Sequence, residues 1–224
     1  MNIGILGSGT VGQTLGAALV ERGENVVLGT RSPKDLGSKR GMGAPLQDWV
    51  DRTKGKARIA TFQESAAHGE IVINATSGTA SLEALKAAGE RNLAGKILID
   101  VANPLDFSKG MPPSLTVCNT DSLGEQIQRA FPNAKVVKTL NTVNTLLMVN
   151  PAQVANGAHD IFISGNDKAA KARVTELLER WFGWKSVIDL GDITTARATE
   201  MLLPLWLRLM GAYGSPMFNF RIVR

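Results

Sequence analysis

The sequence is poor in the residues that most often carry cross-links, metal sites or acid–base catalysis. Its 224 residues include one cysteine, one tyrosine and two histidines. The single cysteine, Cys118, excludes an internal disulfide framework, and no Cys/His cluster has the spacing of a zinc site. We therefore expect neither a disulfide scaffold nor a metal centre.

Long hydrophobic runs are also missing. The longest apolar stretch, residues 201–210, is interrupted by Pro204 and Arg208, and it is far shorter than the roughly 20 residues that cross a bilayer. The chain begins with an apolar run at residues 3–6 and lacks the basic region of a signal peptide. These absences predict a cytoplasmic protein with no membrane partner.

Positive charge is concentrated in one segment. The formal net charge is +5, and residues 31–58 account for the whole excess, with only Asp35, Asp48 and Asp51 as acids. Such a segment attracts anions, but its single aromatic residue, Trp49, provides no base-stacking pattern. We therefore do not expect a nucleic-acid partner. The basic residues of the segment are Arg31, Lys34, Lys39, Arg40, Arg52, Lys54, Lys56 and Arg58.

Strand-like and helix-like segments alternate along the chain. Several strand candidates are continuous apolar runs, as expected for parallel strands covered on both faces. The alternation predicts an α/β fold with a doubly wound, mostly parallel sheet of the Rossmann type. We expect one domain over residues 1–224, with a core at 1–144 and a C-terminal extension at 145–224 that completes the sheet. The predicted strands are residues 3–6, 25–28, 58–61, 71–75, 96–101, 134–140, 160–164 and 186–190; the predicted helices are 11–22, 46–52, 81–88, 123–130, 167–182 and a last one from about 194.

A glycine-rich loop follows the first predicted strand. Gly7, Gly9 and Gly12 form G-x-G-x-x-G between an apolar strand and an amphipathic helix. In this context the glycines allow a tight turn, close approach of the backbone to a pyrophosphate, and close packing of helix and strand. The motif predicts a dinucleotide site that also includes Ser8, Thr10 and Val11, and its alternative is a plain strand-to-helix turn.

The end of the second strand indicates which dinucleotide binds. An Asp or Glu at this place would bind the ribose 2′-hydroxyl of NAD, but the chain carries Thr30, Arg31 and Ser32 instead. Two hydroxyl groups around a guanidinium suit a 2′-phosphate, and Lys34 adds positive charge. The favoured cofactor is NADP(H); the alternative is a turn with a solvated arginine.

The sequence shows no clear acid–base catalyst. Tyr213 has no Tyr-x-x-x-Lys context, and His68 and His159 lie in segments where a structural or exposed role is expected. We therefore assign no catalytic residue. Hydride transfer between two redox cofactors needs little more from the protein than orientation of the rings.

Three segments carry a resemblance to a known family: GSGTVGQTLGAALVERGENVVLGTRSP, VVKTLNTVN and DLGDITTARATEMLLPLWL. Together they resemble the NADP oxidoreductases dependent on coenzyme F420 and the similar cytoplasmic domain of the STEAP metalloreductases. The resemblance implies hydride transfer between NADP(H) and a deazaflavin or flavin. It also implies that the dinucleotide passes the ends of two later strands, at Ala75, Thr76 and Ser77 and at Ala102, Asn103 and Pro104, where simple turns are the alternative.

The same resemblance implies a second-substrate pocket at Asn141, Arg197, Met201 and Leu203. The C-terminal extension at 145–224 would complete this pocket beside the dinucleotide-binding core at 1–144. At Asn141, Met201 and Leu203 the chain departs from the histidine and hydroxyl residues of the archaeal reductases, whereas Arg197 is retained. Arg197 has a second interpretation, a pair on the helix surface with Glu200 three residues later.

Two other functions remain open from the sequence. One is NADPH-dependent reduction of a small imine or carbonyl compound, and the other is a dinucleotide-binding sensor or subunit without turnover. The apolar face of residues 201–210 also predicts a homodimer.

Overall fold

A sheet that is parallel over most of its width organises the chain. In the computed structural model, which describes residues 1–38 and 45–224, the described strands form an eight-stranded sheet in the order β10-β9-β8-β5-β4-β1-β2-β3. From β3 to β8 neighbouring strands are parallel, β9 is antiparallel to β8, and β10 is parallel to β9. This confirms the predicted doubly wound, mostly parallel α/β fold. The strands are β1 (Asn2–Leu6), β2 (Asn25–Gly29), β3 (Ala57–Ala60), β4 (Ile71–Asn74), β5 (Ile97–Asp100), β8 (Lys135–Thr139), β9 (Ile161–Ser164) and β10 (Val187–Gly191).

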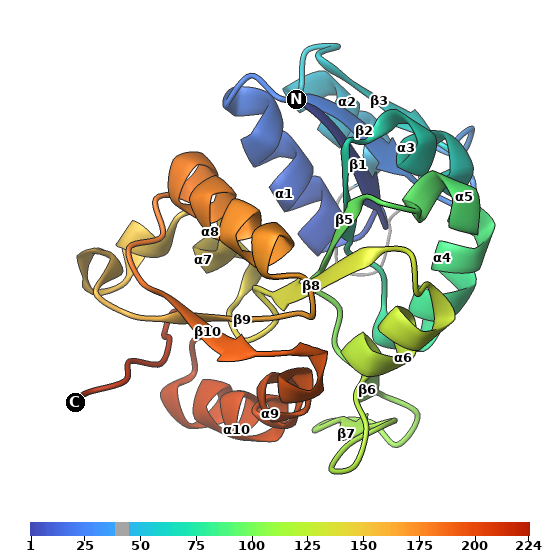
Figure 1. The fold of residues 1–224 in the computed structure, drawn as a ribbon. Helices are drawn as coiled ribbons and strands as arrows, with labels where there is room; N and C mark the ends of the chain where they lie inside the picture. Colours follow the sequence, from blue (N-terminus) through green and yellow to red (C-terminus); the bar gives the residue numbers. More distant parts are fainter. Residues whose placement is uncertain (39–44) are drawn as a thin grey trace.

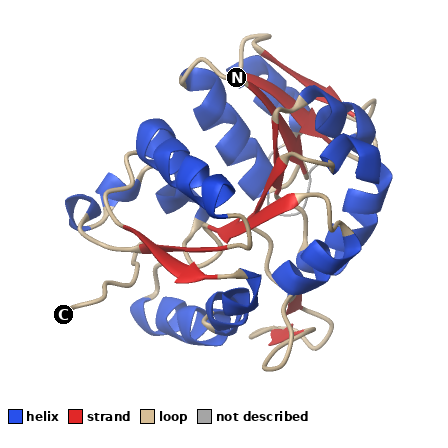
Figure 2. Cartoon of the chain, in the orientation of Figure 1, coloured by secondary structure: helices blue, strands red, loops and turns tan. Residues whose placement is uncertain are grey.

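Helices cover both faces of the sheet (Figure 1; Figure 2). One face is packed by α1, α7 and α8, and the other by α3, α4, α5 and α6. A short hairpin, β6 (Leu105–Asp106) and β7 (Ser114–Leu115), stands apart from the main sheet. The helices are α1 (Thr10–Glu21), α2 (Leu46–Arg52), α3 (Phe62–His68), α4 (Ser81–Ala88), α5 (Glu90–Leu93), α6 (Leu123–Ala130), α7 (Thr145–Val149), α8 (Lys168–Phe182), α9 (Ala196–Met201) and α10 (Leu203–Tyr213).

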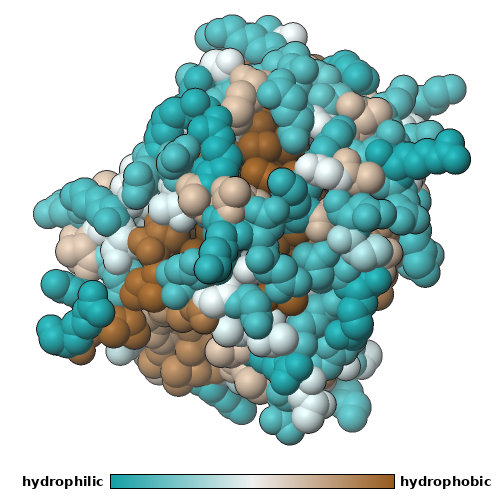
Figure 3. Space-filling view, in the orientation of Figure 1, coloured by the Kyte–Doolittle hydropathy of each residue, from teal (hydrophilic) through white to brown (hydrophobic). Residues whose placement is uncertain are grey.

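The last predicted helix is divided into α9 and α10. Pro204 lies at the start of α10, and because proline has no backbone N–H it cannot continue the hydrogen-bond ladder of the preceding turn. The two helices are therefore separate elements. Hydrophobic surface gathers over α10 and the adjoining β10 (Figure 3). Of the large hydrophobic side chains of α10, Leu205 and Tyr213 are exposed.

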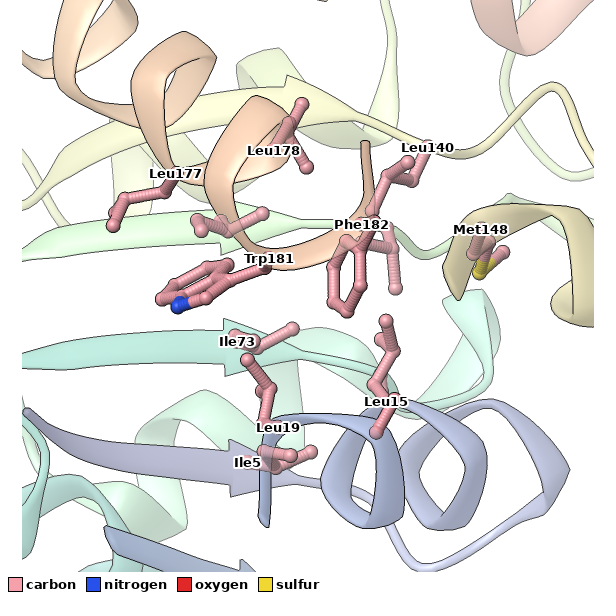
Figure 4. Close-up of a cluster of buried hydrophobic side chains, with 14 of the residues drawn as sticks. Ile5, Leu15, Leu19, Ile73, Leu140, Met148, Leu177, Leu178, Trp181 and Phe182 are labelled. Carbon is pink, nitrogen blue, oxygen red and sulfur yellow. The ribbon is translucent and has the colours of Figure 1, made fainter. Parts of the chain in front are cut away.

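The larger core lies between the sheet and the face formed by α1 and α8. Leu15 and Leu19 of α1 meet Trp181 and Phe182 of α8 in this core (Figure 4). Ile5 of β1 has no exposed surface. Burying side chains of this size stabilises the fold by about 1.5–3 kcal/mol each, so this face anchors the N-terminal strands to the C-terminal part of the chain.

The basic segment is divided by the fold. Lys54 and Lys56 precede β3 and therefore lie at the amino edge of the parallel strands, whereas Arg31 follows β2 and lies at the carboxyl edge. Lys39 and Arg40 lie outside the described residues. The positive charge therefore does not form one patch over the part of the chain that the structure describes.

Candidate functional site

A cavity of about 830 Å³ opens where β1, β2 and β4 end. Its volume lies in the range of small-molecule and cofactor pockets. The glycine-rich loop, the end of β2 and the loop after β4, three regions selected from the sequence, meet in it. The lining residues are Gly7, Ser8, Gly9, Thr30, Arg31, Ser32, Thr61, Phe62, Gln63, Ala75, Thr76, Ser77, Ala80, Glu83, Ala84 and Ala87.

Glycine is needed at the three positions of the loop for different physical reasons. Gly7 has a φ of 113°, and a Cβ there would lie 2.4 Å from the backbone oxygen of Ala75. A Cβ on Gly12 would lie 1.9 Å from the backbone oxygen of Gly7, so helix and loop require glycine there. A Cβ on Gly9 would meet no protein atom within 4 Å. Gly7 and Gly12 therefore serve the fold, whereas Gly9 leaves the backbone open to the cavity.

The N-terminus of α1 faces this loop. Gly9 is the N-cap residue and has no side chain with which to cap the helix, and the first turn of α1 contains no acidic residue. The positive end of the helix dipole and the first backbone N–H groups suit an anionic group here. Thr10 and Val11, which we predicted as contacts, begin the helix beside the cavity and are not in its lining.

The end of β2 places its three predicted residues differently. Arg31 and Ser32 are exposed and line the cavity. Thr30 also lines it but is 5% exposed, and its hydroxyl oxygen accepts a hydrogen bond from Ser8 at 3.1 Å. Thr30 therefore ties the glycine loop to β2, and Lys34 is exposed outside the lining.

The loops after β4 and β5 also differ. Ala75, Thr76 and Ser77 line the cavity, whereas residues 102–104 do not. Asn103 instead pairs with Asn141: each side-chain amide donates to the other residue, at 2.8 and 3.0 Å. This pair joins the carboxyl ends of β5 and β8.

Two parts of the lining were missed by the sequence analysis. Thr61, Phe62 and Gln63 follow β3 at the same edge of the sheet as residues 75–77. The rule that ligands bind at the carboxyl ends of parallel strands would have selected them. Thr61 and Glu64 form a capping box at the start of α3, and the T-x-x-E spacing of that box was visible in the sequence. The other part is one face of α4, with Glu83, Ala84 and Ala87, together with Ala80 immediately before the helix.

The residues assigned to a second substrate do not line this cavity. Asn141 and Leu203 are buried, at 3% and 5% exposed, and Met201 is 38% exposed. The pairing of Arg197 with Glu200 was wrong: the Arg197 guanidinium instead makes two hydrogen bonds to Glu125 of α6, one of them 2.8 Å long between Nε and Oε2. These bonds hold the pKa of the Glu125 carboxyl below its usual value.

Glu200 is buried in a charge network that the sequence analysis did not find. The Lys138 ammonium, 1% exposed, lies 2.8 Å from Asp100 Oδ2 and 2.9 Å from Glu200 Oε1, and it also donates to the backbone oxygen of Ala102. Burial alone would lower the pKa of Lys138, but the two carboxylates outweigh this effect and raise it. The sequence did contain a signal for this buried cation, because Lys138 directly follows two apolar residues of a predicted strand.

Other polar groups have structural partners. His159 is buried, and its Nε2 lies 2.9 Å from the backbone oxygen of Pro151. The Nε2 of His68 lies 3.1 Å from the backbone oxygen of Asn25. Within residues 1–38 and 45–224 no group of His, Cys, Asp and Glu is arranged to hold a metal ion. The same residues contain no helix that is both long and apolar enough to span a bilayer.

Comparisons with known proteins agree with this architecture. The family model described as NADP oxidoreductase coenzyme F420-dependent matches residues 2–104. A crystal structure from Arthrobacter sp. FB24, named as a candidate F420-dependent NADP reductase, is 57% identical, with a TM-score of 0.95 over the whole of both chains. Metalloreductase STEAP3 of Rattus norvegicus is 30% identical over 91% of this chain and 37% of its own length. Metalloreductase STEAP2 of Homo sapiens is 27% identical over 90% and 36%.

This chain therefore spans little more than a third of the curated relatives' length, while it matches the bacterial structure from end to end. The identity to that structure is high over the full length of both chains, and the family model covers strands β1 to β5. The chain belongs to the family of coenzyme F420-dependent NADP oxidoreductases.

Proposed function

We propose that this protein transfers hydride between NADP(H), bound in the cavity, and a flat ring acceptor of the flavin or deazaflavin class. The proposal rests on the lining of the cavity at the end of β2. Arg31 and Ser32 line the cavity there, and none of the lining residues at the end of this strand is acidic. A guanidinium there favours a ribose 2′-phosphate, whereas a carboxylate would repel it.

The residues present fit a dinucleotide. Gly9 leaves open space in front of the α1 N-terminus, which suits the pyrophosphate, while Thr76 and Ser77 extend the lining toward β5. In this proposal the protein binds and orients the nicotinamide, and the cofactor supplies the hydride.

The acceptor class follows from the chemistry of the lining. Among the described residues, the cavity is lined by one ionisable acid, Glu83, and by no His, Tyr, Cys or Lys. Glu83 is exposed and paired with Lys86 at 3.0 Å, so it is poorly placed to protonate a buried substrate. A ring cofactor that accepts hydride directly needs mainly alignment with the nicotinamide, and this requirement supports a flavin or deazaflavin.

Calorimetric titration tests both parts of the proposal. We expect NADPH to bind more tightly than NADH, and the NADPH complex to bind one of coenzyme F420, FMN or FAD and to reduce it. Tight NADPH binding with none of these rings bound or reduced would contradict the acceptor and favour a reductase of small imines or carbonyls, or a sensor. Equal affinity for NADPH and NADH would contradict the cofactor assignment.

We also propose that two copies associate through α10. Leu205 is 50% exposed, and the helix carries a single charged residue, Arg208; an apolar surface of this kind is typical of subunit contacts. Light scattering should give twice the chain mass of 23.9 kDa, and Leu205→Glu should shift it to the monomer value. A monomeric wild-type protein would contradict this proposal.

A further inference from the structure

A buried hydrogen-bond chain leads from the Lys138 network to the wall of the cavity. Asp100 has no exposed surface. Its Oδ2 accepts a hydrogen bond from Lys138 Nζ and its Oδ1 accepts one from Asn74 Nδ2, at 2.8 Å each. The oxygen of the Asn74 amide accepts the Thr76 hydroxyl at 2.7 Å, and Thr76 lines the cavity. Four residues on three strand ends therefore connect a buried cation to the candidate dinucleotide site.

Ser81, the first residue of α4, secures the end of this chain nearest the cavity. Its hydroxyl oxygen lies 2.8 Å from that of Thr76 and 3.2 Å from the Asn74 amide nitrogen, and it donates to the backbone oxygen of Ser77 at 3.2 Å. Ser81 has no exposed surface and is not part of the lining. It therefore holds the loop after β4 from behind.

The opposite end of the hydrogen-bond chain reaches the C-terminal helices. Glu200 of α9 accepts Lys138 on Oε1 and also accepts the backbone N–H groups of Leu123 and Gly124 at the start of α6, at 2.8 and 3.0 Å. One buried cation thus faces two buried carboxylates, and the N-terminus of α6 offsets the excess negative charge. Removing any partner leaves a buried charge or polar group uncompensated, so the residues of the hydrogen-bond chain are held in one arrangement.

We propose that Lys138 is a positioning residue for the dinucleotide site, acting through Asp100 and Asn74 on Thr76 and the loop after β4. This inference rests on the proposed function, because it takes NADP(H) as the ligand. Lys138 does not line the cavity, so its effect on binding is indirect. The network determines where the lining residues after β4 lie.

The order of the sheet makes the effect selective. Arg31 follows β2, whereas Thr76 follows β4, and β1 lies between those strands. A dinucleotide whose 2′-phosphate is at Arg31 must cross β1 before it reaches Thr76. Adenosine 2′,5′-bisphosphate, which reproduces only the adenosine end of NADPH, therefore probes the β2 side without the β4 side.

The experiment compares NADPH and adenosine 2′,5′-bisphosphate on two variants by calorimetry. Ser81→Ala removes one neutral hydroxyl behind the loop, and we expect NADPH affinity to fall about 3- to 10-fold, as for the loss of one hydrogen bond. Lys138→Met removes the cation, and we expect a loss of about 10-fold or more. For both variants the affinity of the bisphosphate should stay within about 2-fold of wild type, the scatter that distant substitutions normally show.

Each variant has a matched control. Ser65 is also fully buried, and its hydroxyl donates to backbone oxygens of Ile5 and Val27, so Ser65→Ala removes an equally buried hydroxyl outside the network. Lys135 lies on the same strand as Lys138 but pairs with Asp167 at the surface, so Lys135→Met removes an exposed cation. Neither control should change the ratio of NADPH to bisphosphate affinity.

The two-ligand design separates positioning from general damage to the fold. Equal loss of both ligands, or an unchanged NADPH affinity in Ser81→Ala, would overturn the positioning role even if Lys138→Met does not fold. Wild-type protein that binds neither ligand would instead overturn the proposed function. Selective loss of NADPH in Ser81→Ala with Ser65→Ala unchanged would support the inference.

Discussion

The two halves of the sheet, on the β2 side and on the β8 side, place a cation in contrasting environments. At the end of β2, Arg31 is exposed at the cavity, whereas at the end of β8 Lys138 is 1% exposed and surrounded by acceptors of the protein itself. Taking a charge out of water costs several kcal/mol, so a buried cation requires internal partners. An exposed cation has no such requirement and can bind an anionic ligand. The position of a positive charge in the sheet therefore indicates whether it serves ligand binding or the fold.

The largest effect on stability should come from Lys138. Lys138→Met leaves Asp100 and Glu200 without their shared cation, and we expect the free energy of unfolding to fall by about 3–5 kcal/mol. Lys135→Met, on the same strand, breaks a surface pair and should cost at most about 1 kcal/mol. Urea unfolding of both variants measures the difference, and similar losses would contradict the contrast between buried and exposed cations.

Arg31 should affect ligand affinity and leave stability nearly unchanged. Arg31→Ala removes a charged hydrogen-bond donor, so NADPH affinity should fall about 10- to 100-fold, corresponding to about 1.5–3 kcal/mol, while NADH affinity stays the same. Its melting temperature should match that of wild type. Lys34→Ala is the control, because Lys34 lies outside the cavity lining. Equal losses for NADPH and NADH would remove the 2′-phosphate role of Arg31.

The glycines of the loop allow the same comparison within four residues. Gly12→Ala forces a Cβ against the backbone oxygen of Gly7, and overpacking of this kind costs about 1–3 kcal/mol. Gly9→Ala meets no protein atom and has a φ of −77°, so it should change stability by less than about 0.5 kcal/mol and yet weaken NADPH binding. Thermal unfolding with and without NADPH checks both. A Gly9→Ala variant with full affinity would show that the dinucleotide does not approach this backbone.

The smallest effect concerns a surface ion pair. Hydrogen bonds from Arg129 lower the pKa of Asp121 from 3.8 to about 2. Because the folded-state pKa is depressed, this stabilisation is present above pH 4 and is lost as the pH falls toward 2. Arg129 is 60% exposed, so solvent screening limits the contribution to about 1 kcal/mol.

Arg129→Gln should therefore reduce stability near neutral pH and flatten its decline between pH 4 and 2. Acid titration followed by circular dichroism measures the decline. Lys86→Gln, which removes an exposed pair with Glu83, should leave it unchanged. If Arg129→Gln has the same acid profile as wild type, the pair makes no contribution.

Local sequence patterns were sufficient for much of the fold. The predicted helices at 46–52, 81–88 and 123–130 coincide with α2, α4 and α6, because apolar periodicity and helix-terminal residues are properties of neighbouring residues. The same is true of the G-x-G-x-x-G loop and of the residues after β2, whereas the residues after β4 were implied by the family resemblance. Strand ends on one edge of a parallel sheet must converge, and the residues after β2, β3 and β4 accordingly meet in the cavity lining.

The alternating elements, the glycine loop and the residues at the end of β2 therefore follow from local sequence. Which charges are buried, and with which partners they pair, depends on the packing of the whole chain. Lys135 and Lys138 lie three residues apart on one strand, but one is at the surface and the other is enclosed. Arg197 pairs with Glu125, 72 residues away, and not with Glu200 three residues later. The physical reason is that burial and ion pairing depend on the lateral order of strands and on helix packing, which bring together residues that no local pattern relates.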